Sequence, residues 1–155
     1  MLRIPFETVQ EELCALLLSR GCPAESAALT AREIARNSLE GVYTHGINRF
    51  PRLMRNIDDG LVRVAAQAER VAGFGALERW DGGLGLGVVN ATRAMERAIA
   101  LAREHGMGLV ALRNTNHWMR AATYGYQACD AGMAALCFTN TMPNMPAWGA
   151  VDARL

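Results

Sequence analysis

Hydrophobic residues recur at helical spacing along roughly the first sixty residues of the chain. In the first stretch, Val9, Leu13, Leu16 and Leu17 fall on one helical face. Similar spacing appears twice more, so we predict three helices, over about residues 5–20, over about 24–39, and from His45 or Asn48 to the Asp-Asp-Gly at 58–60. This part of the chain is therefore expected to be all-helical.

The pattern changes beyond residue 64, where short apolar runs alternate with helical periodicity. The predicted elements are a strand at 76–81, a helix at 88–104, a strand at 109–112, a helix at 119–131 and a strand at 134–140. Strand, helix and strand in that order are typical of a crossover connection in a parallel or mixed sheet. We therefore predict an α/β fold, with a helical segment at 1–64 and part of a mixed-sheet domain at 65–155. The closing TMPNMPAWGAVDARL predicts nothing that would cover the last strand, so this domain is expected to be truncated.

The charge of the chain excludes some classes of function. All sixteen basic side chains are arginine, and they are scattered among fifteen acidic ones, for a formal charge of +1. This distribution argues against a nucleic-acid partner. The absence of lysine removes Schiff-base and P-loop lysine chemistry from this chain.

The cysteines and the N-terminus indicate a compartment. None of Cys14, Cys22, Cys129 and Cys137 forms a CxxC or lies near a histidine at metal-ligand spacing, so we expect reduced thiols and no metal site. The N-terminal MLRIPFETVQEEL turns acidic too soon for a signal peptide, and no apolar run reaches membrane-spanning length. A cytoplasmic protein without a membrane partner is expected.

Two glycine motifs could suggest a phosphate-binding site. A GxGxxA at Gly106, Gly108 and Ala111 follows a predicted helix and precedes a strand, the reverse of the dinucleotide fingerprint, so we reject it. The GGLGLG at 82–87 does open a helix, where a phosphate could bind. A plain turn is the better interpretation, because its spacing fits no phosphate loop.

Two polar loops follow predicted strands. His117 lies in NTNHW after the strand at 109–112, and Thr139-Asn140 ends the strand at 134–140. Ligands of open α/β sheets collect outside the carboxyl ends of the strands, so both segments could line one crevice. Alternatively, the asparagines are turn residues and His117 is an ordinary loop histidine. Composition alone leaves both interpretations open.

The segment GVYTHGINRFPR at 41–52 carries the strongest candidate chemistry. If helical geometry holds from 45 to 52, His45, Arg49 and Arg52 lie on one face. The two arginines would lower the pKa of the histidine, and an anionic ligand would reverse that effect. The alternative is a solvated basic helix face.

SLEGVYTHGINRFPRLMRNIDDG resembles the signature of the malate/L-lactate/sulfolactate dehydrogenase family, which is distinct from the Rossmann lactate and malate dehydrogenases. The resemblance continues through LERWDGGLGLG, HGMGLVALRNTNHWMRAATYGYQAC and CFTNTMPNMPAWGA. It implies an N-terminal helical part followed by an NAD(P)-binding α/β domain without a Rossmann fingerprint. It also implies a homodimer that reduces a small 2-oxo acid with NADH, NADPH remaining open.

The resemblance assigns roles to individual residues. It places the catalytic histidine at His45, the carboxylate-binding arginine at Arg49 and a substrate-contacting hydroxyl at Thr44. The cofactor-binding residues that it implies are Asn116, His117, Thr139 and Asn140. Two alternatives stay open: another 2-hydroxy or imino acid dehydrogenase of the same family, or a catalytically silent remnant that serves only as a folding or interaction unit.

Overall fold

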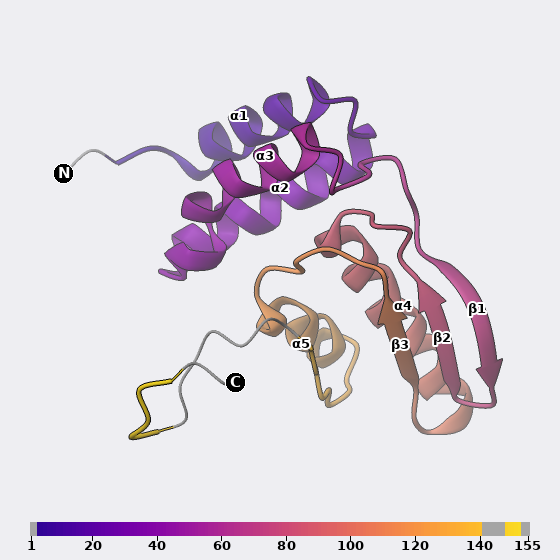
Figure 1. Ribbon diagram of the computed structural model, residues 1–155. Coiled ribbons are helices and arrows are strands. Elements are labelled where there is room, and N and C mark those ends of the chain that lie inside the picture. Colours follow the sequence, from indigo (N-terminus) through magenta and orange to yellow (C-terminus); the bar gives the residue numbers. More distant parts are fainter. Residues whose placement is uncertain (1–2, 141–147, 153–155) are drawn as a thin grey trace.

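The computed structural model describes residues 3–140 and 148–152 of the chain. The N-terminal part is helical, with α1 at Phe6–Leu18 and α2 at Ala24–Leu39 packed against each other (Figure 1). Leu13 and Leu17 of α1 are buried, as their spacing predicts. The first two predicted helices are therefore confirmed within about two residues at either end.

The third predicted helix does not begin at His45. The segment forms two short 3₁₀ turns, Tyr43–His45 and Ile47–Arg49, and α3 follows at Phe50–Asp58. Gly46 separates the turns with φ −101° and ψ −141°, outside helical geometry. A Cβ at Gly46 would lie 2.2 Å from the Oγ of Ser38, so close packing on α2 takes the chain out of the helix. Helical geometry therefore does not hold from 45 to 52, and α3 begins two residues after the alternative start at Asn48.

A three-stranded sheet follows, in the order β1-β2-β3. Its elements are β1 at Glu69–Phe74, β2 at Leu77–Asp81 and β3 at Leu109–Arg113, with α4 at Gly87–His105 between β2 and β3. β2 and β3 are parallel, which confirms the predicted crossover, and α4 packs against β3 (Figure 1). β1 pairs antiparallel with β2 and was not predicted. Its sequence, ERVAGF, does not alternate apolar and polar residues, and all six residues are exposed.

The strand predicted at 134–140 is wrong. After α5 at Ala121–Asp130, these residues pair with no strand in the described part of the chain. Leu136 and Phe138 are 84% and 82% exposed, so the apolar run that suggested a buried strand is largely on the surface. The helix predicted at 119–131 starts two residues late because Met119 has a φ of +64°, which no helical residue adopts.

One hydrophobic core joins the helical and α/β parts. Leu17, Ile34 and Phe50 belong to the same buried cluster as Val88 of α4 and Met119. The two predicted segments therefore pack directly on each other, while the division at residue 64 stays a prediction. No helix in the described ranges is long and apolar enough to span a membrane.

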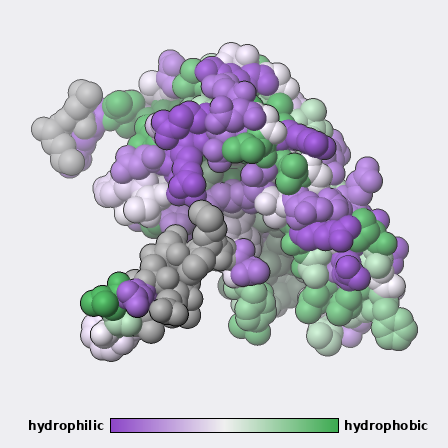
Figure 2. Space-filling view, viewed as in Figure 1, coloured by the Kyte–Doolittle hydropathy of each residue, from purple (hydrophilic) through white to green (hydrophobic). Residues whose placement is uncertain are grey.

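The sheet leaves hydrophobic side chains uncovered. Figure 2 shows them at the lower right, over the β1–β2 hairpin and the adjoining end of the sheet. The residues are Val71, Phe74, Leu77, Met107 and Leu109, each at least 42% exposed. Such an apolar surface is typical of a place where further protein packs.

Candidate active site

The end of α2 positions His45. Buried Asn37 of α2 donates from Nδ2 to the His45 carbonyl at 3.1 Å. Ser38 accepts the backbone N–H of Ile47 at 2.8 Å. These bonds fasten the two turns to α2 on both sides of Gly46. The Thr44 hydroxyl lies 3.0 Å from Nδ1 of His45 and so restrains the imidazole ring itself.

A second loop positions His117. The Asn116 side-chain amide donates to the carbonyls of Leu84 at 2.7 Å and of Leu61 and Gly85 at 3.2 Å. His117 Nδ1 accepts the Met119 N–H at 3.0 Å, so a neutral ring carries its proton on Nε2. The left-handed Met119, a conformation that costs a non-glycine residue about 1–2 kcal/mol, makes this turn possible.

His45 and His117 face each other. Their ring centroids are 5.4 Å apart and the ring planes meet at 38°. The contact brings the 41–52 segment together with the loop that follows β3. Of the histidines, only His105 lies elsewhere, at the C-terminal end of α4.

The surroundings lower the pKa of both histidines. For His45 the largest cause is burial, followed by the positive charges of Arg49 and Arg120. For His117 the causes are burial, then Arg49, His45 and Arg52, and they lower its pKa to about 4. As a whole residue His117 is exposed, so its burial is incomplete and the positive charges add to its effect. The predicted direction at His45 is confirmed, but Arg120 rather than Arg52 is the second charge that acts on it.

Arg49 is a cation without a counterion. It is half-buried, and no carboxylate in the described ranges pairs with it. Burial and the nearby Arg52 lower the pKa of its guanidinium. A partly buried guanidinium with open donors suits a planar carboxylate, which it can hold with two parallel hydrogen bonds.

The loop that carries His117 packs closely on the start of α4. A Cβ at Gly87 would lie 2.2 Å from the carbonyl oxygen of Asn116 and 2.3 Å from that of His117. The backbone of the loop at Asn116 and His117 therefore packs against the first turn of α4. This supports the interpretation of GGLGLG as a turn.

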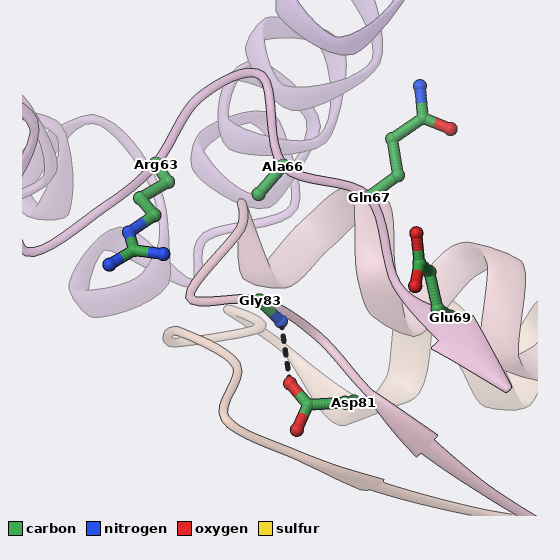
Figure 3. A pocket seen from close by; sticks show the side chains of 6 residues that line it. All are labelled: Arg63, Ala66, Gln67, Glu69, Asp81 and Gly83. Carbon is green, nitrogen blue, oxygen red and sulfur yellow. Dashed lines mark hydrogen bonds between the residues drawn. The ribbon is translucent and has the colours of Figure 1, made fainter. Parts of the chain in front are cut away.

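On its other side, the glycine-rich turn borders a shallow recess of roughly 330 Å³. Asp81 lies in it and accepts the Gly83 N–H at 3.0 Å (Figure 3). The other Asp81 oxygen accepts from Arg113 at 3.1 Å and from Asn114 at 2.8 Å, and these bonds hold the pKa of the carboxyl below its usual value. Asp81 therefore joins the carboxyl ends of β2 and β3 and supports the loop that carries His117.

The candidate residues fall into distinct groups. Thr44, His45, Arg49 and His117 gather at one place, by ring contact, hydrogen bond or charge. The amide nitrogen of Asn116 is occupied by backbone carbonyls. Thr139 and Asn140 are exposed and form no hydrogen bond to other described residues, so their cofactor role stays a prediction.

Arg120 and Glu40 also belong to this region, and no sequence pattern had singled them out. They form an ion pair between residues 80 positions apart. The available signal was the position of Arg120 three residues after His117. Glu40 was inconspicuous because it also pairs with Arg36 at 2.8 Å, an ordinary i,i+4 helix pair.

Comparison with known proteins identifies the group to which this site belongs. The family model for malate/L-lactate dehydrogenase matches residues 4–155. The chain belongs to the malate/L-lactate dehydrogenase family. Among solved structures, it is similar to the malate dehydrogenase of Pyrococcus horikoshii OT3, with a TM-score of 0.82 and 30% identity over 84% of this chain and 38% of that one. It is also similar to the sulfolactate dehydrogenase of Methanocaldococcus jannaschii, with a TM-score of 0.80 and 34% identity over 82% and 37%.

Curated relatives are more similar in sequence than these two structures. The 2,3-diketo-L-gulonate reductase of Citrobacter koseri is 44% identical over 154 residues, which are 99% of this chain and 46% of that protein. The protein of the same name from Escherichia coli O17:K52:H18 is also 44% identical over the same shares. The chain thus spans about half the length of the curated relatives that it matches.

Proposed function

We propose that the complete protein reduces a 2-oxo acid with a nicotinamide cofactor, and that 2,3-diketo-L-gulonate is its substrate. The observation that carries this proposal is Arg49, which pairs with no carboxylate in the described ranges and lies beside the facing pair of His45 and His117. The 44% identity to proteins named 2,3-diketo-L-gulonate reductase supports the substrate. To bind and reduce a 2-oxo acid, the substrate site needs at least one group that binds the carboxylate and one that donates a proton.

Arg49 binds the substrate carboxylate in this proposal. Its guanidinium has no carboxylate partner in the described ranges, so substrate binding breaks no ion pair. The anion also compensates the positive charge that acts on His45 and His117. Binding at Arg49 therefore both orients the 2-oxo group and raises the pKa of His45 toward its ordinary value.

His45 then donates a proton to the carbonyl oxygen while a bound nicotinamide supplies hydride to the carbon. In the free protein, burial and two arginines favour the neutral imidazole. The bound carboxylate favours the imidazolium, so the donor becomes charged when the substrate is present. The Thr44 hydroxyl, 3.0 Å from Nδ1, fixes the ring so that Nε2 is the donating nitrogen.

His117 suits the nicotinamide side of the site. Its lowered pKa keeps the ring neutral at physiological pH, and neither His117 Nε2 nor its proton has a hydrogen-bond partner among the described residues. A neutral N–H donor fits the carboxamide oxygen of a nicotinamide without repelling its positive oxidised form. We propose NADH as the cofactor, with NADPH as the alternative that titration decides.

The remaining features of the proposal concern assembly and location. We propose a homodimer in the cytoplasm, and the uncovered apolar side chains around Phe74 support further protein contact at the sheet. The alternatives are a different 2-hydroxy or imino acid substrate within the family, and a catalytically silent remnant.

Oxidation of NADH and of NADPH by the complete protein tests the proposal against a panel of 2-oxo acids and cyclic imino acids. Highest kcat/KM for 2,3-diketo-L-gulonate is expected. A preference for an imino acid would replace the substrate, and failure with every substrate would favour the silent remnant. Titration of either nucleotide, followed through tryptophan fluorescence, reports cofactor binding independently of turnover.

A further inference from the structure

Arg120 is a third cation at the site, in addition to Arg49 and Arg52. It lies three residues after His117, at the start of α5, and its side chain is 24% exposed. Its partner Glu40 caps the C-terminal end of α2, five residues before His45. The ion pair therefore links the same two segments as the contact between His45 and His117, namely the turn after α2 and the loop after β3.

Three arginines act on the pKa values of the two histidines, and each histidine responds to a different set. Arg49 acts on both rings, Arg52 acts on His117, and Arg120 acts on His45. Although Arg120 is near His117 in the sequence, its charge is felt at His45. Arg120 and Arg49 therefore both act on His45, although they belong to different segments of the chain.

Glu40 satisfies only part of the Arg120 guanidinium. One Glu40 oxygen accepts from Arg36 and the other accepts from Nη1 of Arg120. The ring of Tyr126 lies 5.9 Å from Cζ of Arg120 and limits its motion. In the described part of the chain, Nε and Nη2 of Arg120 donate to no protein acceptor. A half-buried guanidinium is thus held in place with donors left for a ligand.

We propose that Arg120 determines substrate specificity: it donates to an oxygen on the carbon chain beyond the reacting carbonyl, while Arg49 holds the carboxylate. The inference rests on the proposed reductase function and deepens it. The favoured substrates are 2-oxo acids with a hydroxyl or second oxo group at C3 or beyond, the chemistry of an oxidised sugar acid. Glu40 is a positioning residue that orients Arg120.

The test compares pyruvate with 3-hydroxypyruvate in the complete protein with its nicotinamide cofactor, because the two differ by one hydroxyl at C3. Arg120→Gln should lower kcat/KM for 3-hydroxypyruvate by about 10- to 100-fold, mainly through KM, as expected for a lost hydrogen bond to a charged donor. The value for pyruvate should fall much less, and because the Arg120 charge also acts on the pKa of His45 with either substrate, the ratio of the two values is the measured quantity. Arg120→Lys, which keeps the charge but not the fork, should lose selectivity in the same direction.

Arg36→Gln is the matched control, since it removes the other cation from Glu40 and has no effect on His45. It should leave the ratio of the two substrates unchanged. Equal losses on both substrates in the Arg120 variants, or no loss on either, would overturn the proposal.

Binding separates this inference from the proposed function. Glycerate and lactate differ by the same hydroxyl, and quenching of Trp118 beside His117 reports their affinities without turnover. If the unmodified protein reduces no 2-oxo acid, the reductase proposal fails. The Arg120 proposal then still requires a preference for glycerate that Arg120→Gln abolishes, and an unchanged preference contradicts it.

Discussion

His45 and His117 lie with their ring centroids 5.4 Å apart, although one belongs to the turn after α2 and the other to the loop after β3. Both lie within the influence of Arg49, whose positive charge lowers the pKa of each. Two histidines with lowered pKa values beside a guanidinium that has no carboxylate partner among the described residues support the proposal that an anion binds here. The predictions below test the separate parts of this arrangement.

Replacement of His45 by alanine should remove the proton donor. Turnover of the complete protein is expected to fall by about 10²–10⁴-fold, the usual worth of a general acid. Cofactor affinity, measured by nucleotide titration, should change much less. His105→Ala, at the exposed C-terminal end of α4, is the matched control and should be close to unmodified activity. If the His45 variant keeps most of its activity, the segment 41–52 is better interpreted as a solvated basic surface.

The pH dependence of reduction should reflect the lowered pKa of His45. Only the imidazolium donates a proton, so kcat/KM, which reports the free protein, should decline as pH rises through a value below the ordinary 6.5. The bound carboxylate raises the pKa, so the corresponding limb of kcat should lie at higher pH. His45→Ala should lack both limbs. An identical pH profile in the alanine variant would exclude His45 as the donor.

Substitution of lysine at Arg49 should separate charge from geometry. Lysine retains the charge but cannot form the two-pronged bond to a carboxylate, so KM for the acid should rise by roughly tenfold or more. Arg52→Ala removes the exposed neighbour and should change KM little. Steady-state kinetics with both variants would settle the point, because an unchanged KM in Arg49→Lys removes this residue from the carboxylate site.

Much of the fold follows from local periodicity. α1, α2 and α4 repeat apolar residues at helical spacing, and the parallel pairing of β2 with β3 follows from the order of elements. β1 could not be predicted because an exposed strand needs no apolar alternation, and its sequence ERVAGF has none. The strand predicted at 134–140 is absent although its residues are apolar enough for a buried strand. A strand also requires a neighbouring strand to pair with, and the local sequence does not reveal whether one is present.

The site divides in the same way. His45 and Arg49 could be proposed from the sequence because they lie four positions apart, even though Gly46 interrupts the helical geometry that would have aligned them. The packing of Ser38 against Gly46 is a tertiary contact that no spacing indicates. The pairing of Arg120 with Glu40 is likewise invisible in sequence, because either residue alone looks like an ordinary surface charge.

The lowered pKa of His117 should make folding stability depend on pH. In the folded protein the ring resists protonation down to about pH 4, whereas in the unfolded chain it binds a proton near the ordinary 6.5. Its contribution is therefore complete above pH 6.5 and is lost as pH falls from 6.5 toward 4. His117→Asn, which keeps an acceptor for the Met119 N–H, should show a smaller loss over this window than the unmodified protein. Urea unfolding at several pH values measures the free energy of unfolding of each protein, with His105→Asn as the control. Parallel curves for all three proteins would contradict the assignment.

Glu78 links α4 to both neighbouring strands. Its side chain on β2 is 3% exposed and accepts from Arg97 of α4 at 2.8 and 3.1 Å. Arg70 of β1 lies 3.2 Å away, and Trp80 Nε1 donates to it at 2.8 Å. The hydrogen bond with Arg97 is the largest of the effects that lower the pKa of the Glu78 carboxyl. The network lies away from the histidines, so it should affect stability rather than chemistry.

Glu78→Gln keeps the shape of the side chain but removes its charge, leaving two arginines without their counterion. Both guanidiniums remain partly exposed and can be solvated, so the free energy of unfolding should fall by about 1–3 kcal/mol rather than by the larger penalty of a fully buried pair. Because the folded pKa is lowered, the stabilisation is complete above the ordinary value of 4.5 and is lost as pH falls through the folded pKa; the variant should lack this acid dependence. Glu96→Gln, on the exposed side of α4, should cost less than about 0.5 kcal/mol. Urea unfolding at neutral and acid pH distinguishes the two, and equal stability of both variants would mean that the arginines gain as much from water as from Glu78.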